Sequence, residues 1–151
     1  MSLNSAQAKP DVPLSHSLLV MRDALYNMNL IGTGLMVCKG LIAAGNHRLP
    51  VTFLIDTGAS GTFINTRVVK KLGLKPKYLP DPMEIELADG HKVYSHSRLI
   101  FPYSLGSFKD ELDAHVLDLG EHDVILGLSW MRSRLPVIDW RTHTISLIDD
   151  S

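Results

Sequence analysis

The chain has 151 residues, 45% of them hydrophobic, which is enough to bury one core without disulfides or structural metals. Its 15 Lys and Arg residues are balanced by 16 Asp and Glu residues, which argues against an autonomous surface for nucleic acids or anionic membranes. No apolar run approaches a membrane span and the first residues lack a signal-peptide pattern, so we expect a soluble protein.

Residues 1–15 are polar and are interrupted by Pro10 and Pro13, a composition typical of a linker. We therefore assign residues 1–30 to a flexible N-terminal extension and residues 31–151 to one folded domain. Between residues 18 and 28 the apolar positions lie near helical spacing, yet the run at residues 18–21 fits a strand equally well. Both alternatives stay open.

Two apolar, β-prone runs at residues 35–43 and 49–55 flank the turn-forming triplet at residues 44–46, and together they predict a β-hairpin. A short helix is predicted to follow between Asn65, a favourable N-cap, and Gly73, a favourable stop. The single cysteine, Cys38, cannot form an intrachain disulfide and is expected to pack in a strand, which is compatible with a reducing compartment.

Three prolines, at positions 76, 80 and 82, predict an extended connection, after which an Asp89-Gly90 turn joins the strands of a second hairpin. Trp130 and Trp140 are expected to anchor the core. Further short strands are predicted where Gly, Asp or Pro separate apolar runs, at residues 99–105, 112–117, 123–126, 137–140 and 144–148. The fold class is therefore mostly β.

The strand predicted at residues 51–55 ends in Asp56, and Gly58 permits a tight turn that leaves the Asp56 carboxylate at an open edge. The loop Asp56-Thr57-Gly58-Ala59 resembles the Asp-Thr-Gly-Ala loop of retropepsins, the dimeric aspartic proteases of retroviruses and long-terminal-repeat retrotransposons. The residues on either side of the loop fit that family too. Taken alone, Asp-Thr-Gly also fits an exposed Asp that opens a surface turn.

A second segment, residues 123–130 (Asp-Val-Ile-Leu-Gly-Leu-Ser-Trp), resembles the second retropepsin marker, in which an apolar pair precedes Gly and a short helix. The resemblance extends over residues 35–147 and is strongest to the proteases of Ty3/gypsy-type retrotransposons. It implies a retropepsin-like closed β-barrel half with one or two short helices, active as a two-fold dimer.

Peptide hydrolysis by paired carboxylates needs two acids, and the chain carries a single Asp-Thr-Gly. A two-fold homodimer supplies the second acid by placing Asp56 of one copy against Asp56 of the other. The resemblance implies catalytic positions at Asp56, Thr57 and Gly58, with Thr57 bracing the two loops across the axis and Gly58 offering its carbonyl to substrate.

The second hairpin occupies the place of the retropepsin flap, which closes over an extended peptide, although an ordinary turn is the alternative. Ile125 and Leu126 would form apolar subsite walls or simply pack in the core. The substrate-binding positions that the resemblance implies are Ala59, Ser60, Ala88, Asp89, Gly90, His91, Ile125 and Leu126.

The chain also departs from several retroviral relatives. Those enzymes carry an Asp after the Ala of the active loop and an Arg after the Gly of the second marker, and the two form a bracing ion pair. Here the positions hold Ser60 and Leu128, so both charges are absent together and no orphan charge is buried. Subsite preferences therefore do not transfer.

We expect a homodimeric aspartic endopeptidase that cleaves extended polypeptides with an activated water, in the setting of Gag-Pol-like polyprotein processing. The alternative is a domesticated retropepsin-like domain that dimerises or binds peptides with little turnover. The expected partners are a second copy and a polypeptide, with no nucleic acid, membrane or cofactor. No metal is expected either, because the seven His residues form no metal-binding motif. The implied location is the cytoplasm or virus-like particles within it.

Overall fold

The computed structural model describes residues 24–31, 35–86, 90–142 and 144–147, with side chains described from Met36 onward. Ten strands and two short helices make up this part of the chain. In chain order they are β1 (Ala24–Ile31), β2 (Leu35–Ala44), β3 (His47–Ile55), β4 (Thr62–Asn65), α2 (Thr66–Leu72), β5 (Lys77–Glu86), β6 (Lys92–Leu105), β7 (Phe108–Leu117), β8 (Val124–Leu126), α3 (Leu128–Arg134), β9 (Val137–Asp139) and β10 (Thr144–Leu147).

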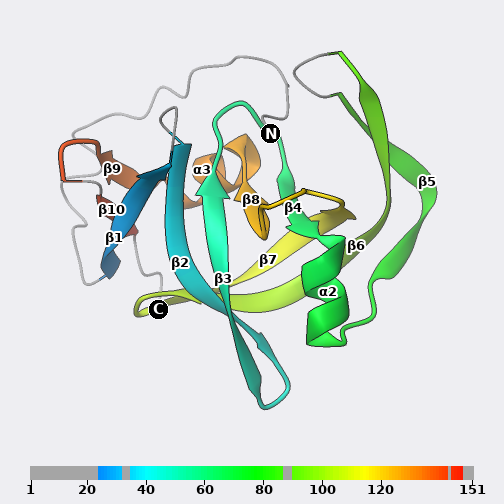
Figure 1. Ribbon diagram of the computed structural model, residues 1–151, viewed down its shortest axis with the longest axis horizontal. Helices are drawn as coiled ribbons and strands as arrows, with labels where there is room; N and C mark the ends of the chain where they lie inside the picture. The colour runs from blue at the N-terminus through cyan, green and yellow to red at the C-terminus, as the bar shows by residue number, and fades with distance from the viewer. Residues whose placement is uncertain (1–23, 32–34, 87–89, 143, 148–151) are drawn as a thin grey trace.

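The sheet closes on itself as a barrel (Figure 1). Its strand order is β5-β6-β7-β4-β8-β3-β2-β1-β10-β9, and a further pairing of β6 with β2 closes a ring of 6 strands. Two pairs in the ring, β3 with β8 and β4 with β7, are parallel. The predicted mostly-β, retropepsin-like barrel is confirmed, and of the one or two short helices expected, two are present in the described residues.

Alternation along β6 shows how the barrel acquires its core. Leu99, Phe101, Tyr103 and Leu105 are buried, whereas Ile100 between them is 59% exposed. Successive strand side chains point to opposite faces, so this period of two turns one face of β6 inward. The register with β7 then pairs Phe101 with Leu112 and Leu99 with Ala114, which brings more buried side chains into the same core.

Two predicted local structures are confirmed. The first hairpin forms as β2 and β3, with Ala44 paired to His47 across the turn. Helix α2 has the predicted caps: Asn65 Oδ1 accepts a hydrogen bond from the Arg67 amide at 3.1 Å, and Gly73 ends the helix with a φ of 69°. Both helices have 7 residues, and no helix in the described ranges is long and apolar enough to cross a membrane.

Strand β5 begins earlier than the prolines indicated. Residues 77–78 and 83–86 pair with β6, and the register shifts between Tyr78 and Met83, the stretch that contains Pro80 and Pro82. Proline lacks the amide that a ladder needs, and an edge strand with an irregular register tolerates this loss. The expected extended connection is therefore largely strand.

Two further differences concern the ends of the domain. Residues 24–31, part of the predicted extension, form β1 and pair with both β10 and β2, so a strand is realised there rather than a helix. Residues 1–23 lie outside the described part of the chain, and the division at residue 31 stays a prediction. Trp130 is buried as predicted, but Trp140 is 58% exposed beyond β9, which corrects its assignment to the core.

Candidate active site

The predicted catalytic loop lies where β3 leaves the barrel. Phe53, Leu54 and Ile55 at the end of β3 are buried, and Asp56 follows with 7% exposure. The Asp56 amide donates to the Leu126 carbonyl of β8 at 3.0 Å, and the Ala59 amide donates to the Asp56 carbonyl at 3.1 Å. The backbone of Asp56 is thus fixed on both sides, by a neighbouring strand and by its own turn.

The two carboxylate oxygens of Asp56 have different surroundings. Oδ1 accepts a hydrogen bond from the Gly58 amide at 2.9 Å, whereas Oδ2 is buried and has no hydrogen-bond partner among the described residues. A buried carboxylate oxygen without a partner is costly unless another group completes the site. Asp56 is therefore oriented by its own loop, and its Oδ2 is left without a hydrogen bond among the described residues.

The second marker, residues 123–130, supports the loop through backbone contacts. Gly127 connects β8 to α3, and the first amides of α3 reach the loop: Leu128 N donates to Ala59 O at 2.8 Å, and Ser129 N donates to Ser60 O at 2.9 Å. A Cβ added at Gly127 would lie 2.2 Å from Gly61 O, closer than any side chain allows. Only a residue without a side chain fits at Gly127, where the two backbone segments approach closely.

Ser60 and Leu128 occupy the two positions at which several retroviral relatives carry an ion pair. Leu128 is 3% exposed and Ser60 is exposed, so the side chain that replaces the Arg is apolar and packs in the interior. The two backbone hydrogen bonds from α3 brace the loop where the relatives use charges. No buried charge is left uncompensated at either position.

The other part of α3 is tied to the β6–β7 hairpin by buried polar groups. Trp130 Nε1 donates to the Tyr103 hydroxyl at 2.9 Å, and that hydroxyl donates to Asp110 Oδ2 at 2.9 Å. Arg134 pairs with the other oxygen of Asp110 at 2.6 Å. Burial raises the pKa of Tyr103 well above its ordinary value, so the hydroxyl keeps its proton and remains a donor.

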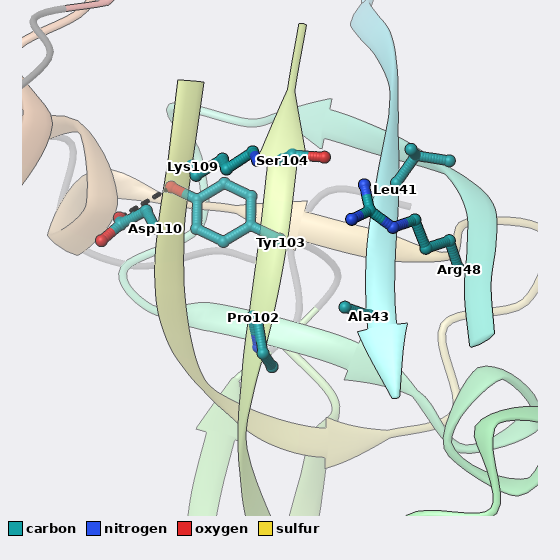
Figure 2. A pocket seen from close by; sticks show the side chains of 8 residues that line it. All are labelled: Leu41, Ala43, Arg48, Pro102, Tyr103, Ser104, Lys109 and Asp110. Atoms are coloured by element: carbon teal, nitrogen blue, oxygen red, sulfur yellow. Dashed lines mark hydrogen bonds between the residues drawn. The ribbon is translucent and has the colours of Figure 1, made fainter. Parts of the chain in front are cut away.

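Tyr103 and Asp110 also line a pocket of about 110 Å³ formed by residues of β2, β3, β6 and β7 (Figure 2). Figure 2 shows them on one side of it and Leu41 and Arg48 on the other. No residue of the loop at 56–61 lines this pocket, so it is separate from the candidate active site. Within the described ranges, no three His, Cys, Asp or Glu side chains are grouped as metal ligands.

The predicted substrate-binding residues have varied surroundings. Ser60, Gly90 and His91 are exposed. Ile125 and Leu126 are both 0% exposed in this chain, so they pack in the core beneath the loop and offer no open subsite wall. Ala59 is likewise fully buried and contributes its carbonyl to α3, while Ala88 and Asp89 lie outside the described residues.

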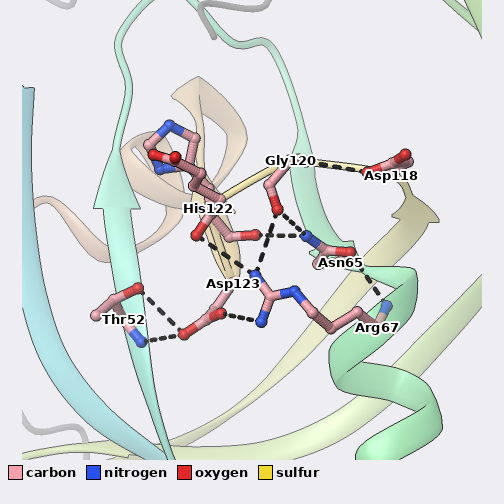
Figure 3. Close-up of polar contacts among 8 residues, drawn as sticks. Thr52, Asn65, Arg67, Asp118, Gly120, His122 and Asp123 are labelled. Atoms are coloured by element: carbon pink, nitrogen blue, oxygen red, sulfur yellow. Dashed lines mark hydrogen bonds and ion pairs between the residues drawn. The ribbon is translucent and has the colours of Figure 1, made fainter.

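The sequence prediction missed a polar cluster at the start of β8 (Figure 3). Asp123 accepts hydrogen bonds from Thr52 and forms an ion pair with Arg67 at 2.9 Å, and Asn65 donates to the carbonyls of Gly120 and His122. Only the capping role of Asn65 could be predicted from local pattern. The partners of Asp123 are 71 and 56 residues away, so no local signal identified them.

Similarity to solved structures identifies the class of this fold. The structure is similar to the retroviral protease-like domain of Ddi1 from Leishmania major, with a TM-score of 0.55 at 16% identity over 76% of this chain and 90% of that one. It is also similar to a retropepsin-like aspartic protease from Rickettsia conorii, with a TM-score of 0.57 at 19% identity over 83% and 90% of the two chains. The fold is that of retropepsin-like aspartic proteases.

The sequence identifies the family within that class. Residues 52–151, which include the active loop and the second marker, match the PEG10/RTL1 protease domain. The chain therefore belongs to the PEG10/RTL1 protease domain family.

Proposed function

We propose that this protein is a homodimeric aspartic endopeptidase in which the Asp56 carboxylates of two copies meet at a two-fold axis. The observation that carries the proposal is the state of Asp56: Oδ1 is held by the Gly58 amide, and Oδ2 is buried without a partner in the described chain. A symmetric dimer would place an identical carboxylate beside that of Asp56 and give the unpaired Oδ2 a partner. The retropepsin-like fold and the family match support this arrangement.

The chemistry follows from the sharing of one proton. Two adjacent carboxylates cannot both ionise cheaply, so one Asp56 is charged and the other is protonated. The charged carboxylate takes a proton from water, whose oxygen attacks the scissile carbonyl carbon, while the protonated carboxyl donates its proton to the carbonyl oxygen. Proton transfer to the amide nitrogen then releases the amine and leaves a carboxylic acid. This scheme predicts faster cleavage at acidic than at alkaline pH.

The surrounding residues supply positioning in this proposal. Thr57 is exposed beside Asp56 and would hydrogen-bond across the axis, and Gly58 would present its carbonyl to the substrate backbone. Gly90 and His91 are exposed at the start of β6, where a flap would cover an extended peptide. We propose an extended polypeptide as the substrate, with processing of a Gag-Pol-like polyprotein as its setting.

Digestion of a peptide library by the wild-type protein and by Asp56→Asn tests the proposal. The substitution removes the charge with little change in volume, so folding, followed by circular dichroism, should be retained while cleavage is lost. Dimerisation, measured by sedimentation, should be similar in both proteins. A wild-type dimer that binds peptides without cutting any of them would instead favour the domesticated binding domain. Cleavage by Asp56→Asn at the wild-type rate would exclude Asp56 as the catalytic acid.

A further inference from the structure

Strand β8, which supports the backbone of Asp56, is short. It has only 3 residues, all buried, and it lies between β3 and β4. Its last residue, Leu126, accepts the hydrogen bond from the Asp56 amide at 3.0 Å. Any shift of β8 along its axis therefore moves the support of Asp56.

Apolar packing alone fixes such a strand poorly along its length. Burial of Val124, Ile125 and Leu126 contributes stability, but the hydrophobic effect has no direction and changes little with a small slide. Hydrogen bonds do have direction, and they weaken steeply as their geometry degrades. The ladders of β8 to β3 and β4 span only three residues each, so the groups that hold the polar entry to β8 act with these ladders to set its position.

Asp123, the residue before β8, is held from three elements (Figure 3). Its Oδ2 accepts from Thr52 of β3, from the amide at 2.9 Å and from the hydroxyl at 3.2 Å. Its Oδ1 pairs with Arg67 of α2 at 2.9 Å, and its carbonyl accepts from the Asn65 amide at 2.8 Å. The Asp123 side chain is only 18% exposed, so these contacts are poorly replaced by water.

Asn65 and Arg67, at the start of α2, also hold residues 120–122, the segment that leads into Asp123. Asn65 Nδ2 donates to Gly120 O at 3.0 Å and to His122 O at 2.8 Å. Arg67 Nη2 lies 3.4 Å from the carbonyls of Gly120 and Glu121. Figure 3 shows the Arg67 and Asn65 side chains extending from α2 and its cap toward this segment. Residues 120–123 are thus held through their carbonyl groups, whatever their side chains.

We propose that Asp123, held by Arg67, is a positioning residue for the Asp56 site: it sets the register of β8 against β3 and so the placement of Asp56. The inference rests on the proposed protease function. Because the Arg67 side chain is 53% exposed, its ion pair contributes little to stability, and its loss should affect the site more than the fold. That separation distinguishes positioning from a purely structural role.

The test compares Arg67→Met with Lys70→Met, which removes an exposed cation from the same helix. Arg67→Met should lower kcat roughly tenfold or more, because small displacements of catalytic groups are costly. KM and the unfolding midpoint should change little. Arg67→Lys should recover part of kcat, and Lys70→Met should match the wild type. Asp123→Asn, which keeps an acceptor for Thr52, should resemble Arg67→Met.

A second readout does not depend on turnover. The amide resonances of Asp56 and Gly58, followed by NMR, should shift in Arg67→Met and stay in place in Lys70→Met. A wild-type protein that cleaves nothing would refute the proposed function, and these resonances would still test the positioning. Wild-type kcat together with unmoved resonances in Arg67→Met would overturn the inference. A loss of activity that only follows a loss of folded protein would overturn it as well.

Discussion

Two glycines, Gly127 beneath the active loop and Gly90 before β6, are required for opposite physical reasons. At Gly127 an added Cβ would lie 2.2 Å and 2.5 Å from two backbone carbonyl oxygens. At Gly90 an added Cβ would meet no atom within 4 Å, but the backbone has a φ of 89°. The first glycine is required by crowding and the second by conformation.

The difference separates a fixed region of the molecule from an open one. Around Gly127 the chain is bound by backbone hydrogen bonds to Ala59 and Ser60 and by fully buried side chains. Gly90 is exposed, with open space around its Cβ position. In the proposed protease, the first region would be the rigid chemical centre and the second a cover with room to approach substrate. Substitutions in the two regions should therefore have different effects.

The largest effect is expected at Gly127. Gly127→Ala forces a methyl group against the Gly61 and Ala59 carbonyls, and backbone atoms there have little freedom to yield. We expect a loss of about 1–3 kcal/mol or more in unfolding free energy, with activity falling further than stability. Urea unfolding measures the loss. Gly61→Ala is the matched control, because its Cβ would make ordinary contacts of 3.5 Å and longer; equal destabilisation of the two would contradict the crowding argument.

Gly90→Val should act on turnover. A β-branched residue disfavours a left-handed backbone and would obstruct a close approach to substrate, so kcat/KM should fall strongly while dimerisation, measured by sedimentation, stays nearly unchanged. Gly45→Val is the control, since Gly45 has a φ of 58° and the same open space in the β2–β3 hairpin. Both variants carry similar strain, but only Gly90→Val should lose activity with a fluorogenic peptide. Near-normal kinetics would make residues 89–90 an ordinary surface turn.

Tyr103→Phe tests the hydrogen bonds that join α3, the helix after Gly127, to the β6–β7 hairpin. The change removes the acceptor of the buried Trp130 Nε1 and a donor to Asp110. An unsatisfied buried donor costs about 1–3 kcal/mol, and thermal unfolding should show a loss of that order. Tyr78→Phe, at a side chain 77% exposed, should change stability little. If the two variants were equally stable, the Tyr103 hydroxyl would not anchor α3.

The smallest effect concerns His115, whose ring packs beside Phe63 in the barrel wall. Burial lowers the pKa of His115 below 6.5, and nearby Arg98 lowers it further while Asp113 opposes both. The unfolded chain therefore binds the proton more readily, so this contribution to stability is present above about pH 6.5 and is lost as the pH falls.

His115→Gln should reduce the loss of stability between pH 7.5 and 5. The difference should stay below about 1 kcal/mol, because the imidazole keeps contact with solvent. Chemical denaturation at both pH values measures it, with the exposed His47→Gln as the control. If His115→Gln lost as much stability between pH 7.5 and 5 as the wild type, His115 would not be a source of the pH dependence.

Local pattern predicted the parts of the fold that local physics decides. The β2–β3 hairpin and the caps of α2 at Asn65 and Gly73 follow from residue type and position in the chain. The prolines of β5 led to the prediction of an extended connection where a strand is found. An edge strand tolerates proline, and only the assembled sheet shows that β5 lies at an edge.

The candidate site divides in the same way. Asp56 could be predicted because a strand, a carboxylate and a glycine lie together in sequence. For Ile125 and Leu126 the sequence left subsite wall and core packing open, and the contacts of Asp123 could not be predicted, since all of them depend on β8 lying between β3 and β4. That pairing is a long-range property of the barrel.

The central claim is that two copies of Asp56 form one catalytic site. Co-expression of wild-type and Asp56→Asn chains with different affinity tags yields mixed dimers that tandem purification separates from both parents. With a fluorogenic peptide, the shared site predicts that mixed dimers have almost no turnover, as in the Asp56→Asn homodimer. Mixed dimers with full wild-type turnover per dimer would contradict the claim.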